Sequence, residues 1–130
     1  MFDKVEYWLE LCDDDIRAAK NLLASKDYLW MSFLCHLVIE KAIKAVFASK
    51  TDKVPPKIHN LPKLAEKAML LDDLSDEQLD FLEELTPFNI EARYPSYKDK
   101  MMAKLSPEYC KNLLTRTEEY LCWTRQKLEK

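Results

Sequence analysis

The side chains best suited to chemistry lie in residues 86–105, where Arg93 stands beside Tyr94 and close to Tyr97. An arginine guanidinium can bind a phosphate through two parallel hydrogen bonds, and a tyrosine ring can stack on a nucleobase. This stretch therefore supplies four candidates for contact with a nucleotide or RNA: Arg93, Tyr94, Tyr97 and Lys98. The alternative is structural, with Arg93 paired to a carboxylate and the tyrosines closing the end of the core.

A second group of polar residues lies in an apolar stretch. His36 and Glu40 are four positions apart, so a helix would place them on one face. They would form either a polar pair in a cleft or a buried histidine satisfied by Glu40 or by a backbone carbonyl. In the first case they could supply a proton acceptor near Arg93. His59 is predicted to be a capping or core-edge residue.

Basic residues are unevenly distributed. Residues 41–63 contain six lysines and one acid, and Lys41 and Lys44 join the candidates for phosphate contact. If residues 93–104 adjoin this stretch, the two form a basic patch inside an acidic protein. That patch could bind a nucleotide phosphate, RNA, or the acidic residues 72–84 of a partner. Lysines spaced for solubility are the alternative.

Several classes of site are excluded by composition. The 130 residues include no glycine, which removes the P-loop, the dinucleotide fingerprint and the nucleophile elbow. The four cysteines form no C-x-x-C pair and are expected to be reduced, and Cys12, Cys35 and Cys110 fall at buried positions. No metal or cofactor is predicted. The net charge of −3 argues against sequence-blind coating of nucleic acid.

These residues would be positioned by helices. Apolar residues recur at three- and four-residue steps, predicting long helices over 3–25, 28–49 and 106–130 and shorter ones over 61–71 and 75–86. The predicted caps are Asp27, Asn60, Ser75 and Ser106. The sequence therefore predicts an all-α, up-and-down bundle of about five helices, with residues 1–130 as one domain and the first two helices antiparallel.

The remaining stretches give three further expectations. Residues 28–39 are apolar nearly all round, which favours the centre of a bundle or a homodimer interface. This uncharged run is too short to span a bilayer, so a cytoplasmic protein without membrane contact is expected. Residues 13–15, all aspartate, are expected to be a solvated surface. Residues 86–105 are expected to be a long irregular connection that presents Arg93, Tyr94 and Tyr97.

The sequence resembles the HEPN family (higher eukaryotes and prokaryotes nucleotide-binding domain) in three places. Residues 90–95, Ile-Glu-Ala-Arg-Tyr-Pro, look like the loop of that family. Residues 40–45, Glu-Lys-Ala-Ile-Lys-Ala, resemble its Glu-Lys-x-x-Lys stretch. Residues 59–61, His-Asn-Leu, resemble the His-x-Leu that starts its third helix. The matches span nearly the whole chain in order.

The resemblance implies a small helical bundle, commonly a homodimer, often encoded beside a minimal nucleotidyltransferase and linked to nucleotides or RNA. Many members are metal-independent ribonucleases with an Arg-x4-6-His motif. In this chain the positions five to seven after Arg93 are Lys98, Asp99 and Lys100. The histidine is absent, so the sequence resembles the subset that has a Glu-Ala-Arg-Tyr-Pro loop without the ribonuclease motif.

Three interpretations follow. The first is a non-catalytic dimer that binds nucleotide or RNA with a nucleotidyltransferase partner, in a toxin–antitoxin-like or defence module. The second is a divergent ribonuclease in which a residue such as His36 replaces the missing base. The third is a structural interaction module whose loop closes the bundle.

Overall fold

The structure, a computed structural model, describes residues 3–90 and 95–129, with backbone alone at residues 90 and 95–98. In this part of the chain there are helices and no strands. The long helices are α1 (Lys4–Ala24), α2 (Tyr28–Lys50) and α7 (Pro107–Leu128), and the shorter ones are α3 (Leu61–Lys67), η1 (Leu71–Asp73), α4 (Asp76–Leu85), α5 (Pro87–Ile90) and α6 (Pro95–Lys104). The predicted all-α bundle is confirmed.

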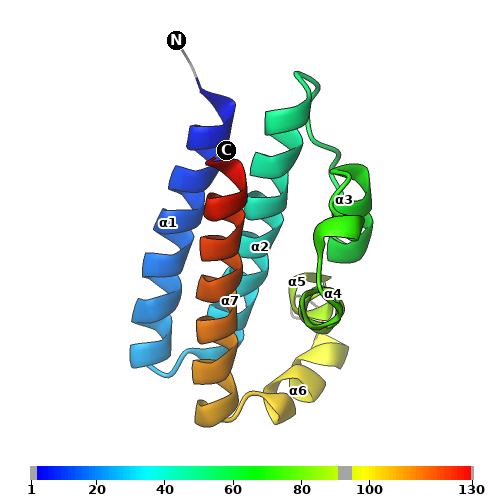
Figure 1. The fold of residues 1–130 in the computed structure, drawn as a ribbon. Helices are drawn as coiled ribbons and strands as arrows, with labels where there is room; N and C mark the ends of the chain where they lie inside the picture. Colours follow the sequence, from blue (N-terminus) through cyan, green and yellow to red (C-terminus); the bar gives the residue numbers. More distant parts are fainter. Residues whose placement is uncertain (1–2, 91–94, 130) are drawn as a thin grey trace.

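The helices α1 and α2 form an antiparallel hairpin, as predicted, and α7 lies beside both (Figure 1). Asp3 caps α1, because its side chain accepts a hydrogen bond from the Glu6 backbone at 3.1 Å. Asp27 precedes α2 but makes no capping bond; its carboxylate accepts from the Ser25 hydroxyl at 2.6 Å instead. Asp27 therefore stands at the predicted N-cap position, but its side chain does not cap the helix.

The second helix is the centre of the molecule. It packs against α1 and α7 on one side and against α3, α4, α5 and α6 on the other (Figure 1). Its buried positions accordingly occur all round the helix, from Met31 and Cys35 through Val38 and Ile39 to Ile43. This agrees with the apolar pattern, although Trp30 at its start is 57% exposed and is not a core residue.

Helix ends are made without glycine. The predicted caps Asn60, Ser75 and Ser106 each accept a backbone hydrogen bond, and Ser75 forms a complete capping box with Gln78. The backbone of Lys26 and Met69 adopts positive φ, 66° and 59°, the left-handed conformation that usually selects glycine. Because Met69 turns the chain there, α3 ends at Lys67 and is shorter than predicted.

The stretch 86–105 differs most from the prediction. Instead of an irregular connection, it contains the helices α5 and α6. Pro87 and Pro95 each stand at the first position of a helix, where a proline has no hydrogen bond to lose. The expectation of an irregular connection is therefore wrong for the described parts of this stretch, because these prolines begin helices. Residues 91–94 between the two helices lie outside the described residues.

The cysteines largely agree with expectation. Cys12, Cys35 and Cys110 are buried free thiols, while Cys122 is exposed on α7. Burial raises the pKa of Cys12 and of Cys35 to about 12, which disfavours the thiolate that reacts. Among the described residues no group of histidine, cysteine and carboxylate side chains has the arrangement of a metal site. None of the described helices is both long and apolar enough to cross a membrane.

Candidate functional site

A buried carboxylate, Glu40, lies in the second half of α2 with 7% of its side chain exposed. Its Oε1 lies 3.1 Å from Nδ1 of His59, and its Oε2 accepts a hydrogen bond from Lys44 Nζ at 2.9 Å. Burial acts to raise the pKa of the Glu40 carboxyl, but the hydrogen bonds from His59 and Lys44 outweigh it and lower that pKa. Glu40 is therefore an ionised acceptor at neutral pH.

His36, one turn before Glu40, is fully buried. Its Nε2 lies 2.9 Å from the backbone oxygen of His59. A carbonyl only accepts, so Nε2 of His36 bears a proton and donates it. The Nδ1 atom of His36 is 3.7 Å from Glu40 Oε1, beyond hydrogen-bond distance. His36 thus fixes the backbone of His59, and its burial keeps it away from solvent.

His59 is the partly exposed member of this group, which we call the Glu40 cluster (His36, Glu40, Lys44 and His59). Its side chain is 44% exposed. Because the Glu40 carboxylate only accepts hydrogen bonds, Nδ1 of His59 bears the proton and Nε2 of the neutral ring is an acceptor. A histidine whose Nδ1–H is held by a carboxylate in this way can accept a proton at Nε2.

The start of α3 positions His59. Asn60 caps the helix by accepting from the Lys63 backbone at 3.0 Å, and the Leu61 backbone donates to the Thr86 hydroxyl at 3.1 Å. That hydroxyl in turn donates to the Leu82 carbonyl at 2.8 Å, at the end of α4. The cluster therefore joins α2 and α3 at a junction that α4 also holds. The sequence predicts His59 as a capping or core-edge residue, and no local spacing links it to Glu40.

The predicted phosphate-binding lysines are already paired. Lys41 Nζ lies 2.6 Å from Asp15 Oδ2, and Lys44 is held by Glu40 with its Nζ 5.4 Å from the centre of the Trp8 ring. The sequence predicts a solvated surface for Asp15, but only 17% of its side chain is exposed because Lys41 packs over it. The positive charges of Lys41 and Lys44 are thus balanced within the fold.

Other lysines of the basic stretch are more open. Lys50 donates to the backbone oxygens of Ala68 and Met69, at the end of α3. The exposed lysines 53, 57 and 63 make no ion pair with any described residue.

The structure describes the remaining predicted site residues only in part. Arg93 and Tyr94 lie outside the described residues; Tyr97 and Lys98 lie in α6, where the backbone alone is described. The helices on either side, α5 and α6, both pack against α2, the helix that bears Glu40. Asn89 in α5 is buried, and neither atom of its amide has a hydrogen-bond partner among the described residues. Nothing in the sequence pattern singles out Asn89 beyond its place before the Glu-Ala-Arg-Tyr-Pro stretch.

Comparison with known proteins identifies the chain. The crystal structure of TT1696 from Thermus thermophilus is similar in fold, with a TM-score of 0.81 and 19% identity over 97% of this chain and 99% of that one. A comparison with curated proteins found no match. The HEPN domain family matches residues 5–127, nearly the full length. The chain therefore belongs to the HEPN domain family.

Proposed function

We propose that this HEPN protein is a non-catalytic homodimer that binds a nucleotide or RNA and works with a minimal nucleotidyltransferase in a toxin–antitoxin-like or defence module. Membership of the HEPN family indicates a nucleotide- or RNA-related function. The ligand, the partner and the dimer go beyond what family membership indicates, and we propose them in addition. Arg93 is its principal phosphate-binding residue, with Tyr94, Tyr97 and Lys98 beside it in sequence.

The Glu40 cluster is the observation that supports this proposal best. Burying a carboxylate beside two histidines and a lysine costs desolvation free energy. Close-packed apolar side chains would stabilise a helical bundle equally well, so stability alone does not account for this cluster. Ionisable groups with shifted pKa values gather at functional sites, and Glu40 has such a shift on the helix that α5 and α6 flank. Since Lys41 and Lys44 are paired, the phosphate contact falls to Arg93.

Self-association is supported by an exposed tryptophan. Trp30 is 57% exposed at the start of α2, and its ring meets that of Phe33 edge to face with centroids 6.0 Å apart. Exposed aromatic surface of this kind is typical of protein interfaces. Light scattering at micromolar concentration should give the mass of a dimer; a monomer mass would remove the dimer from the proposal.

Titration calorimetry with ATP and with short RNAs tests the ligand. Arg93→Ala should weaken binding at least tenfold, since a charged bidentate phosphate contact is lost. Arg17→Ala is the matched control, because Arg17 is an exposed arginine of α1 paired with Asp14 at 3.0 Å. Absence of binding in the wild type would contradict the proposal, as would equal losses in the two variants.

The alternative function, a divergent metal-independent ribonuclease, is favoured by a different observation. The interpretation from sequence named His36 as the substitute base, but His36 is fully buried and donates to a carbonyl. His59, oriented by Glu40 and partly exposed, is the better proton acceptor. Incubation of RNA with the protein in EDTA should then give cleavage that His59→Gln and Arg93→Ala both abolish. RNA that stays intact for hours with the wild type would exclude this function.

A further inference from the structure

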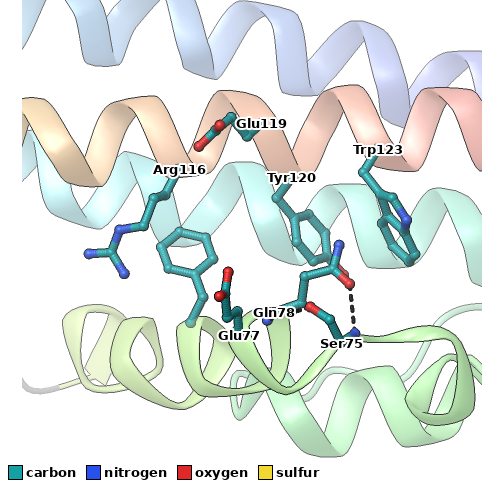
Figure 2. A pocket seen from close by; sticks show the side chains of 8 residues that line it. Ser75, Glu77, Gln78, Arg116, Glu119, Tyr120 and Trp123 are labelled. Carbon is teal, nitrogen blue, oxygen red and sulfur yellow. Dashed lines mark hydrogen bonds between the residues drawn. The ribbon is translucent and has the colours of Figure 1, made fainter.

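A second site lies between α4 and α7 and shares no residue with the Glu40 cluster. It is a pocket of about 390 Å³. Figure 2 shows its side chains, which come from the first turns of α4 on one side and from one face of α7 on the other. The lining residues are Ser75, Glu77, Gln78, Phe81, Arg116, Glu119, Tyr120 and Trp123.

The pocket has an aromatic lining with an unsatisfied hydroxyl. Tyr120 is 3% exposed, and its ring extends from α7 toward Gln78 and Ser75 (Figure 2). Its hydroxyl has no hydrogen-bond partner among the described residues. A buried hydroxyl without a partner costs stability, so a ligand that reaches it gains a bond that the free protein lacks.

The arginine of the pocket is already neutralised. The Nη1 and Nη2 atoms of Arg116 donate to the two oxygens of Glu84 at 2.9 and 2.8 Å, and these bonds raise the pKa of Arg116. Glu84 also accepts from the Tyr109 hydroxyl. The Nε atom of Arg116 is buried and has no acceptor among the described residues. Arg116 therefore keeps an unused Nε–H donor, and its positive charge is balanced by Glu84.

Two carboxylates at the pocket are free. Glu77 and Glu119 are exposed and make no ion pair with a described residue. Glu77 belongs to residues 72–84, which contain seven acids and no base. The pocket is therefore negative, and it repels anions such as phosphate while attracting cations.

The aromatic rings of the pocket also favour cations. Arg116 lies over the Phe81 ring at 4.9 Å from its centre, and Lys127 Nζ is 5.9 Å from the centre of the Trp123 ring. Cations lie against such rings because the ring face is negative. Two rings of the pocket thus already attract the protein's own cations.

We propose that this pocket binds an organic cation, an ammonium or guanidinium group, beside the carboxylates of Glu77 and Glu119 and against the aromatic lining. A hydrogen-bond acceptor elsewhere on the ligand would accept a hydrogen bond from the Tyr120 hydroxyl or from Arg116 Nε–H. The cation could belong to a free amine or to a lysine or arginine side chain of another protein. The inference does not rest on the proposed nucleotide or RNA ligand.

Calorimetry at low salt with two probes tests this inference. Agmatine is a free diamine-like cation without an acceptor, and N-acetylarginine amide represents an arginine within a peptide. Glu77→Gln together with Glu119→Gln should weaken binding of both probes about tenfold, since each exposed carboxylate contributes about two- to fivefold. Asp80→Asn together with Glu83→Gln is the control, because it also removes two negative charges, both from α4, at residues that do not line the pocket. It should change affinity less than about twofold.

Tyr120→Phe separates the pocket from general charge attraction. Loss of the hydroxyl should weaken N-acetylarginine amide about threefold and leave agmatine unchanged, because agmatine has no acceptor. Binding of N-acetylarginine amide alone would identify a protein partner as the source of the cation, whereas binding of both probes would admit free amines. Failure of both probes to bind would overturn the inference, as would equal losses of affinity in the two double variants. Titration with AMP serves as the anionic comparison, and binding of AMP that is tighter than binding of either cation would also overturn the inference.

Discussion

At the scale of residues, Glu40 explains why a helix core contains ionisable groups. Each oxygen of its carboxylate has a separate partner, His59 or Lys44, and both bonds require the ionised form. The carboxylate therefore fixes the tautomer of His59, while His36 fixes its backbone. Removal of one partner would leave buried charge uncompensated, so we expect the cluster to act as a unit.

Acidification tests the charge of Glu40. Its pKa is lowered in the folded protein, so its contribution is present above its usual value of 4.5 and is lost as the pH falls through the lower folded pKa. Chemical denaturation should show that the unfolding free energy of the wild type falls more steeply below about pH 4.5 than that of Glu40→Gln. At pH 7 the variant should be less stable by about 3 kcal/mol.

Glu83→Gln is the control for this measurement, because Glu83 is exposed and outside the cluster. It should keep the pH dependence of the wild type. An acid limb that is unchanged in Glu40→Gln would show that the carboxylate is not the group that is protonated.

At the scale of elements, the helix ends show what local sequence determines. Ser75 and Gln78 form a capping box from adjacent positions, and Ser106 with Pro107 begins α7, so both starts were predictable. Pro87 and Pro95 begin α5 and α6 by the same rule, yet a proline is equally compatible with a loop. The turns at Lys26 and Met69 could not be predicted, because their residue types give no signal for positive φ. The contact of His59 with Glu40 could not either, since it depends on how α3 packs on α2.

The capping box gives a direct test at this scale. Ser75→Ala removes the acceptor for the Gln78 backbone at 3.1 Å and should lower the unfolding free energy by about 1 kcal/mol. Ser75→Asp retains an acceptor at that position and should remain close to the wild type. Equal losses in the two variants, measured by urea denaturation, would mean that the hydroxyl is not needed as a cap.

The left-handed turn after α3 gives a second test. Met69 is 74% exposed with a φ of 59°, so Met69→Gly loses little packing and relieves the unfavourable conformation. We expect an unfolding free energy about 0.5–1 kcal/mol higher. Met102→Gly, an exposed methionine inside α6, should instead be destabilised by about 1 kcal/mol. A loss of stability in Met69→Gly would contradict the assigned turn.

At the scale of the whole molecule, the central position of α2 connects the cluster to every layer of the bundle. The helix lies between the α1 and α7 side and the side formed by the shorter helices (Figure 1). Its all-round apolar pattern predicted this position, whereas the pocket between α4 and α7 depends on residues more than thirty positions apart and had no counterpart in the sequence. The same packing encloses the thiols of Cys12, Cys35 and Cys110.

Thiol labelling tests this packing. With Ellman's reagent, the folded protein should react rapidly at Cys122, the exposed thiol, and slowly at the three buried ones. All four should react in denaturant. Cys122→Ser should lose the rapid phase. Rapid reaction of more than one thiol in the folded wild type would show that the bundle is more open than described.

The central claim, that the chain binds a nucleotide or RNA through Arg93, is tested most directly by titration of short RNAs into three proteins under one condition. We expect measurable binding by the wild type, the same affinity for Arg17→Ala, and an affinity at least about tenfold lower for Arg93→Ala. Wild-type binding that Arg93→Ala leaves unchanged, or no binding by any of the three, would contradict it.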